Sequence, residues 1–204
     1  MTAATSTTPE RDIMLLWLTH TTGIRVTELS LLKISDVMFP SGDLRSEVFL
    51  RPVITKHCRP RTIYLTHVRA IEAVEEWLDY RQRRGWECGQ GATYRGFWGG
   101  STLVLTHKGR AFEQSFKTRK LKTGSKTYRV CDSLQQSISR TYRRAGIWGG
   151  SSHSGRRTLA NRVVASTGSI ELAQQILGHS ELEHVAPYLD IDPQIIRLAF
   201  TLAL

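Results

Sequence analysis

Hydrophobic residues recur at helical spacing along most of the chain. In the first such segment they occupy positions 13, 15, 16 and 18. Thr8-Pro9 precedes them and indicates the start of this helix, because proline is tolerated in the first turn. Positions 68, 71, 74, 77 and 78 repeat the pattern. The spacing predicts helices over residues 9–22, 28–33, 67–84, 132–145, 154–166 and 170–177, and a last helix from Asp192 to the C-terminus.

A second pattern is rich in β-branched and aromatic residues. It covers residues 47–54 and 61–65, which flank the basic segment 55–60, and predicts an antiparallel ribbon with a basic connecting turn. Residues 103–105 are a further, short candidate strand, whereas six glycines between Gly85 and Gly100 indicate an irregular loop. Together the patterns predict an α+β fold that is mainly α-helical, with a small antiparallel β-ribbon or sheet.

The composition is that of a globular protein with a basic surface. Of the 204 residues, 40% are hydrophobic, enough for the core of one domain with or without a small appended subdomain. The chain has 28 Lys and Arg against 18 Asp and Glu, a net charge of +10. This excess suits a polyanionic partner better than an acidic small molecule, although a generic basic protein would carry the same charge.

The basic residues are clustered along the chain. Residues 117–129 contain no acidic side chain and are too basic to form a core element, so we expect this segment to order only against a polyanion such as DNA. Further clusters lie at residues 81–84, 140–144 and 156–162. These clusters could line a duplex by neutralising its phosphates.

The three cysteines, Cys58, Cys88 and Cys131, are far apart and form no C-x-x-C pair, so they indicate neither a disulfide framework nor a zinc ribbon. This usage favours a reducing cytoplasm. No apolar run is long enough to span a bilayer, and residues 1–10 are polar and rich in threonine. We therefore expect a protein that is neither secreted nor anchored in a membrane.

Two pairs of charged or polar residues share a three-residue spacing at predicted helix starts. Arg25 and Glu28 can lie on one helix face, where a structural ion pair is the simplest interpretation. His153 and Arg156 stand at another helix start, where backbone amides point outward and favour an anion. Neither pair is specific by itself.

His179 follows Gly178 and precedes Tyr188 by nine residues. Each has an ordinary structural explanation, because the histidine can decorate a helix terminus and the tyrosine can be a half-buried aromatic with an exposed hydroxyl. As a nucleophile toward a DNA phosphate, a phenol with an ordinary pKa of about 10 needs cationic and hydrogen-bonding neighbours. Arginines and histidines are such neighbours.

Taken together, these motifs resemble those of the tyrosine recombinase (lambda-integrase, or phage integrase) family. The matching segments are, in chain order, Thr22 to Leu29, Ile54 to Lys56 with Arg59 to Ile63, Ser152 to Thr158, Leu177 to Ser180, and Tyr188 to Asp190. Each motif is weak, but their joint order and spacing are specific. The resemblance runs from the first predicted helix to the end of the chain and implies the fold of the family's catalytic domain.

The resemblance implies a site-specific DNA recombinase or integrase. Tyr188 would attack the scissile phosphate and form a 3′-phosphotyrosyl intermediate, which conserves the bond energy for religation without ATP. Arg25 and Arg156 would bind the non-bridging oxygens, where planar guanidinium groups fit a phosphate. Glu28 would orient this arginine network.

The remaining motif residues would serve proton transfer. Lys56, on the ribbon turn, would protonate the leaving 5′-oxygen, His153 would assist proton transfer at the tyrosine hydroxyl, and His179 would donate a hydrogen bond to the phosphate. The resemblance implies no cofactor and no metal, because these cations do the work of a divalent ion. Ribbon length varies in the family, and Arg59 and Arg61 lie close to Lys56 in the sequence.

The expected partner is double-stranded DNA. The residues expected to contact it are Arg59, Arg61, Lys117, Arg119, Lys120, Lys122, Lys126 and Arg157. Family members also form tetramers on DNA in which the C-terminal segment docks on a neighbouring protomer, and the apolar face of the last predicted helix would suit this, although it could equally pack on its own domain. We expect a prokaryotic cytoplasmic protein associated with the nucleoid.

Two features depart from the family pattern. Almost nothing precedes the first helix, so residues 1–204 are expected to be a single catalytic domain without the family's N-terminal core-binding domain. Gly155 stands where many relatives have leucine.

Two alternative functions fit the same motifs. One is a type IB topoisomerase, which nicks and closes DNA with similar groups, and the other is a DNA-binding relative that no longer cleaves.

Overall fold

The computed structural model describes residues 6–55, 58–121 and 124–178. In chain order the elements are α1 (Pro9–Thr21), α2 (Val26–Leu31), α3 (Ile34–Val37), β1 (Glu47–Leu50), η2 (Pro52–Ile54), β2 (Arg61–Tyr64), α4 (Val68–Arg83), η4 (Thr93–Gly96), β3 (Ser115–Leu121), β4 (Gly124–Val130), α5 (Asp132–Arg144), α6 (Ser154–Thr167) and α7 (Ile170–Leu177). The predicted fold class, mainly helical with small antiparallel sheets, is confirmed.

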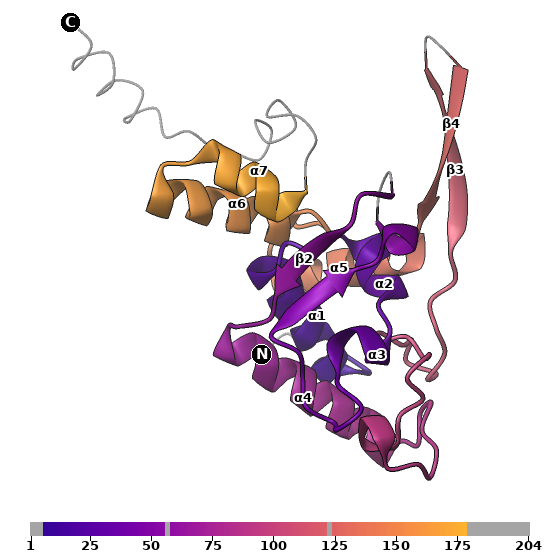
Figure 1. The fold of residues 1–204 in the computed structure, drawn as a ribbon. Coiled ribbons are helices and arrows are strands. Elements are labelled where there is room, and N and C mark those ends of the chain that lie inside the picture. Colours follow the sequence, from indigo (N-terminus) through magenta and orange to yellow (C-terminus); the bar gives the residue numbers. More distant parts are fainter. Residues whose placement is uncertain (1–5, 56–57, 122–123, 179–204) are drawn as a thin grey trace, which may run out of the picture.

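Helix α1 runs through the centre of the fold and packs against α4 on one side and α6 on another (Figure 1). Its apolar positions Met14, Leu15 and Leu18 are buried, and α4 contributes Trp77 and Leu78 to the same core. The helical spacing of these residues is therefore explained by burial on facing sides of the two helices.

The predicted ribbon is present, with β1 and β2 antiparallel. Val48 lies opposite Ile63, and both are buried, whereas Glu47 and Tyr64 oppose each other on the exposed face. Opposed residues share a face, and side chains alternate between faces along a strand. Arg61, the register partner of Leu50, therefore belongs to the face of the ribbon that is turned toward the body of the protein.

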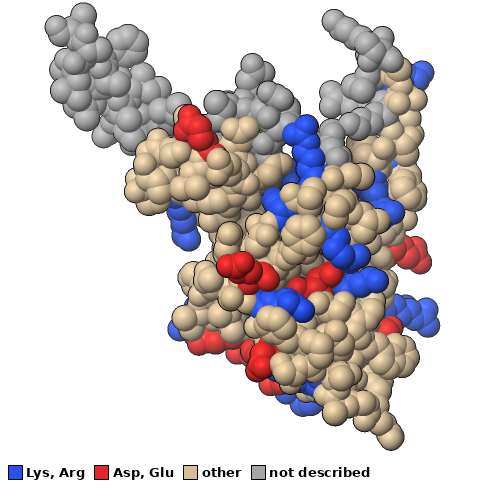
Figure 2. Space-filling view, viewed as in Figure 1, with Lys and Arg blue, Asp and Glu red and all other residues tan. Residues whose placement is uncertain are grey.

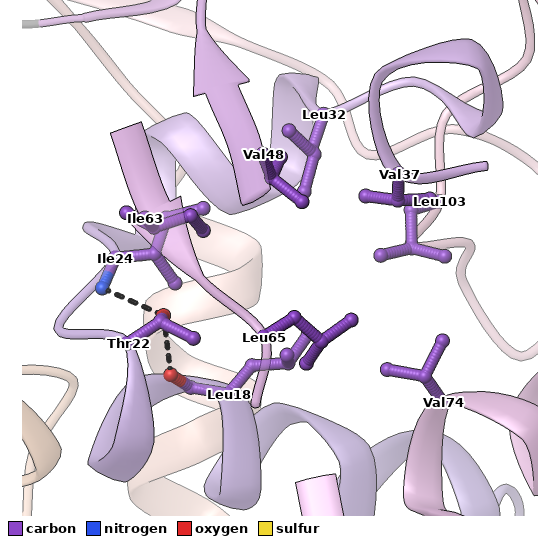
Figure 3. Close-up of a pocket in the computed structure, with 10 residues that line it drawn as sticks. All are labelled: Leu18, Thr22, Ile24, Leu32, Val37, Val48, Ile63, Leu65, Val74 and Leu103. Atoms are coloured by element: carbon purple, nitrogen blue, oxygen red, sulfur yellow. Dashed lines mark hydrogen bonds between the residues drawn. The ribbon is translucent and has the colours of Figure 1, made fainter. Parts of the chain in front are cut away.

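Beneath the ribbon, the core leaves an apolar cavity of about 10 Å³ (Figure 3). Leu18, Leu65 and Val74 are among the side chains that line it, and the hydroxyl of Thr22 donates a hydrogen bond to the carbonyl of Leu18 at 2.7 Å. A space of this size without unsatisfied polar partners is a packing defect and cannot hold a ligand.

Residues 115–130 differ from the sequence-based prediction. The expectation that the basic segment 117–129 lacks regular structure in the absence of DNA is wrong, because β3 and β4 pair in an antiparallel hairpin from Ser115–Val130 to Leu121–Gly124. The hairpin projects away from the helices as an arm (Figure 1). Most of its side chains are exposed on both faces, so the sequence has none of the hydrophobic alternation by which a half-buried strand is recognised.

The short strand predicted at residues 103–105 is also wrong. Leu103, Val104 and Leu105 are fully buried, but the chain makes only isolated bridges here, between Lys33 and Thr102 and between Leu105 and Ala111. An apolar run of three residues indicates burial without specifying a strand. The irregular character predicted for residues 85–100 is present, with the single 3₁₀ turn η4 inside it.

Several expectations fall outside the described residues. They concern Lys56, Lys122, His179, Tyr188 and the last predicted helix from Asp192. Within residues 6–55, 58–121 and 124–178, no helix has both the length and the apolar character that crossing a bilayer requires.

Candidate active site

The first turn of α6 carries His153 and Arg156. His153 is the N-cap residue and is exposed, whereas Arg156, one turn later, is 1% exposed. Between them the buried Gly155 faces α1, so the helix start lies close to the end of α1. The predicted helix start is present, and it directs one side chain of the motif outward and the other into the protein.

Arg156 ties α6 to two other segments. Its guanidinium donates one hydrogen bond to the carbonyl of Gly23, in the turn between α1 and α2, and another of 2.9 Å to the carbonyl of Leu177 at the end of α7. Gly23 has a φ of +62°, and a Cβ there would lie 2.9 Å from Leu177 Cδ2. Glycine at position 23 thus allows both the turn and the close approach of α7.

Arg25 stands at the entrance of α2, as its spacing predicted, and forms the expected ion pair with Glu28. Its Nη1 lies 3.0 Å from Glu28 Oε1, and its backbone N–H donates to Glu28 Oε2 at 2.9 Å. The second contact satisfies a free N–H group at the helix start. Arg25 Nη2 donates to the carbonyl of Gly178 at 3.0 Å.

Both arginines therefore reach the C-terminal end of α7, at consecutive carbonyls. The last carbonyls of a helix lack partners within the helix and carry partial negative charge, so guanidinium groups stabilise them. Gly178 ends the helix in the left-handed region, with φ +61°. The next residue in the chain is His179. Arg25 and Arg156, from two different motifs, thus both contact the segment that directly precedes the motif of His179.

Arg61 has a partner that the sequence did not predict. It was expected to contact DNA, but its Nη1 and Nη2 donate to the two carboxylate oxygens of Glu28 at 2.7 and 2.6 Å. Its side chain is 10% exposed and that of Glu28 is 1% exposed. No signal in the sequence links these two residues, which are far apart along the chain.

The electrostatics of this cluster are set by burial and by the two arginines. Burial of the Glu28 carboxyl by itself would raise its pKa, but the hydrogen bonds from Arg61 and the positive charges of Arg61 and Arg25 outweigh it, so the pKa of Glu28 lies below its ordinary value of 4.5. The carboxylate is ionised at neutral pH and holds two guanidinium groups. Among the described residues there is no cluster of three or more His, Cys, Asp and Glu side chains suited to a metal ion.

A sequence profile of the phage integrase family matches residues 1–194. The chain belongs to the phage integrase family. The motifs from which the resemblance was inferred all lie within the matched residues. The comparison with curated proteins gave no match.

Solved structures show the same fold as this integrase-family chain. The XerA recombinase superposes with a TM-score of 0.65 at 22% identity, over 99% of this chain and 60% of that one. The XerH recombinase in a post-cleavage complex gives 0.64 at 19%, over 97% and 46%, and the Tn1549 transposon integrase gives 0.52 at 15%, over 96% and 58%. The chain thus spans about half to three fifths of the length of these proteins.

Basic residues expected to contact DNA occupy several parts of this integrase-family fold. Arg59, Lys120 and Arg157 are exposed, and the ammonium of Lys117 lies 2.7 Å from the carboxylate of Asp132. Arg119 and Lys126 are register partners in the hairpin. Figure 2 shows Lys and Arg side chains gathered between the α6–α7 pair and the hairpin, on the face where the β1–β2 ribbon lies.

The hairpin also has exposed groups that the sequence analysis did not select. Phe116 is 66% exposed, and the guanidinium of Arg129, its register partner, lies 5.7 Å from the ring centroid. Farther along the same face, the hydroxyls of Thr118 and Thr127 lie 3.0 Å apart. An aromatic residue opposite a basic one on neighbouring strands can indicate an exposed face of this kind, but the two are seen to be opposite only once the register of the hairpin is known.

Proposed function

We propose that this chain is the catalytic domain of a site-specific recombinase or integrase that cleaves and rejoins double-stranded DNA through Tyr188. The observation that supports this most directly is the meeting of Arg25 and Arg156 at the consecutive carbonyls of Leu177 and Gly178, immediately before His179, in a chain of the phage integrase family. Two guanidinium groups near one histidine are suited to a phosphate whose negative charge grows during attack.

The proposed reaction has two transesterification steps. The phenolic oxygen of Tyr188 forms a bond to the scissile phosphorus while the bond from phosphorus to the 5′-oxygen breaks, which leaves a 3′-phosphotyrosyl ester and a free 5′-hydroxyl. His153 accepts the phenolic proton and Lys56 supplies a proton to the 5′-oxygen. A 5′-hydroxyl then attacks the ester in the reverse sense, so neither ATP nor a metal is required.

Arg25 retains the capacity to bind a phosphate in this arrangement. A guanidinium has five N–H donors, and the contacts of Arg25 with Glu28 and Gly178 use one on each terminal nitrogen. Its side chain is 21% exposed. A phosphate could therefore bind at Arg25 without removing the ion pair that positions it. Arg156 and His179 would complete the contacts to the non-bridging oxygens.

DNA would be held by basic residues outside the reacting centre. The residues proposed to contact phosphates are the exposed Arg59 and Arg157, the hairpin residues Lys117, Arg119, Lys120 and Lys126, and Lys122, which lies outside the described residues. Two similar structures are of XerH bound to a palindromic difH substrate and of the Tn1549 integrase in complex with transposon right end DNA, and such complexes support a duplex as the partner.

The decisive experiment traps the covalent intermediate. A duplex nicked near the scissile phosphate loses its short 5′-hydroxyl fragment on cleavage, so the adduct accumulates and is counted as a protein-DNA band that resists denaturation. Tyr188→Phe should abolish the adduct and keep DNA binding. Tyr64→Phe, a change at an exposed tyrosine on the outer face of the ribbon, is the control and should form it. An adduct formed by Tyr188→Phe would disprove the assignment of the nucleophile.

Further measurements separate the alternative functions. Relaxation of supercoiled DNA without strand exchange would identify a type IB topoisomerase, and site binding without any adduct would identify a relative that no longer cleaves.

Lys56 is tested with a substrate whose 5′-leaving atom is sulfur, which departs without protonation. Lys56→Ala should slow cleavage of the ordinary substrate strongly and that of the sulfur substrate much less. Equal losses would exclude Lys56 as the acid.

The domain organisation and assembly are part of the proposal. Residues 1–204 would act as one catalytic domain, and the segment after Asp192 would dock on a neighbouring protomer of a DNA-bound tetramer. Deleting this segment should lower the mass of the protein-DNA complex measured by light scattering. An unchanged DNA-bound oligomer would count against docking between protomers.

A further inference from the structure

We propose that Arg61 is a positioning residue for the reaction, which holds Arg25 in place through Glu28. The inference rests on the proposed function, since it concerns the arginine that would bind the scissile phosphate. Arg61 was expected to contact DNA because of its charge and its place in the ribbon, and this role is a different one.

The contacts of Glu28 carry the argument. Oε1 accepts from Nη1 of both arginines, Arg25 at 3.0 Å and Arg61 at 2.7 Å, and Oε2 accepts from the backbone N–H of Arg25 at 2.9 Å and from Nη2 of Arg61 at 2.6 Å. The carboxylate is thus held at both oxygens by the parallel bonds from Arg61, a geometry that fixes its rotamer. Arg25 therefore donates to a Glu28 carboxylate whose position is fixed by Arg61.

Burial argues against Arg61 as a direct DNA contact. Its side chain is 10% exposed, less than the 21% of Arg25, and both of its terminal nitrogens face Glu28. Rotation toward a phosphate would leave the 1% exposed carboxylate of Glu28 without its shortest hydrogen bonds. Removing one partner of a buried charge pair is costly, so Arg61 is expected to stay in place when DNA binds.

Arg61 also touches the other segments of the site. A Cβ built on Gly178 would lie 2.8 Å from Cδ of Arg61, so the stem of this side chain packs against the residue that precedes His179. Arg61 itself begins β2, and Lys56 lies five positions earlier in the sequence. One side chain therefore joins β2, the entrance of α2 that carries Arg25, and the end of α7.

The test compares cleavage rates under single turnover with saturating nicked duplex. Arg61→Ala should lower the first-order rate by about 100-fold, the loss expected when a reacting group is displaced by about 1 Å, and should change the half-saturating DNA concentration little. Arg61→Lys, which keeps the charge but not the two parallel bonds, should recover part of the rate. Arg51→Ala is the matched control, because Arg51 makes the same kind of paired contact, two bonds of 2.9 Å, but to Asp36 of α3 instead of Glu28.

A second substrate distinguishes positioning from a general structural role. With a neutral methylphosphonate at the scissile position, less cationic stabilisation is needed, so the loss caused by Arg61→Ala should be much smaller than with the phosphodiester. Equal losses on both substrates, or weaker DNA binding with an unchanged first-order rate, would overturn the assignment. If Arg61→Ala does not fold, Arg61→Lys carries the same comparison.

The failure of this inference is distinguishable from failure of the proposed function. A wild-type chain that formed no covalent adduct would overturn both. A wild-type chain that forms the adduct, with an Arg61→Lys protein that cleaves both substrates at the wild-type rate, would overturn only the role of Arg61.

Discussion

Gly155 and Thr19 are in direct contact where α6 meets α1: a Cβ at position 155 would lie 2.7 Å from the carbonyl carbon of Thr19. Gly155 is the position at which the sequence departs from the leucine of many relatives. The contact brings the start of α6, and with it Arg156, against the turn after α1. The departure therefore has a physical reason in this chain, since the backbone of α1 occupies the space of a side chain.

Gly155→Ala should consequently destabilise the protein. Alanine gains about 1 kcal/mol of helix propensity, but overpacking against backbone costs about 1–3 kcal/mol, and Gly155→Leu should cost more than Gly155→Ala. Urea denaturation measures the free energy of unfolding. Gly91→Ala is the control, because a Cβ there meets nothing within 4 Å, and its change should stay within about 0.5 kcal/mol. A Gly155→Leu protein as stable as wild type would contradict the packing.

Arg25 and Arg156 should differ in their effects on stability. Arg156 is 1% exposed and satisfies the carbonyls of Gly23 and Leu177, so Arg156→Ala leaves buried acceptors unpaired, at about 1–3 kcal/mol each. Arg25→Ala removes a group that is 21% exposed, and Glu28 keeps its bonds to Arg61. Both variants should fail to form the adduct, while urea denaturation should show a much larger loss for Arg156→Ala. Equal losses would contradict this division.

The sequence predicted the parts of the site that local patterns encode. The helix starts that carry Arg25 and Arg156, the glycine that ends α7 and the pairing of the ribbon all follow from spacing and capping. The bond between Arg61 and Glu28 could not be predicted in this way, because it depends on the inner face of a ribbon meeting a helix start. The hairpin was missed for another reason: its stability comes from backbone pairing, with no buried face to mark it.

The ionisation of Glu28 predicts a pH dependence of stability. Its pKa is lower in the folded protein than the ordinary 4.5, so the carboxylate stabilises the fold above that value, and the contribution disappears as the pH falls through the folded-state pKa. Glu28→Gln should therefore be less stable than wild type at pH 7, and the difference should shrink below about pH 4.5. Urea denaturation across this range measures it. A difference that stays constant down to pH 3 would exclude Glu28 as the titrating group.

The hairpin offers two lysines of equal charge in different surroundings. Lys117 pairs with Asp132 at 2.7 Å, whereas Lys120 is exposed and shares a face with Phe116 and Thr118. A lysine that already neutralises a protein carboxylate must give up that partner to bind a phosphate. One that faces solvent releases counterions from DNA without this cost.

Lys120→Ala should therefore weaken DNA binding more than Lys117→Ala. The slope of log affinity against log salt concentration should become shallower by about 0.9 when one phosphate contact is lost, and a smaller change is expected for Lys117→Ala. The loss for Lys120→Ala should be the same on the recombination site and on a duplex of shuffled sequence, because a phosphate contact carries no base information. Equal slopes for wild type and Lys120→Ala would mean that the exposed face of the hairpin does not lie against the DNA backbone at this position.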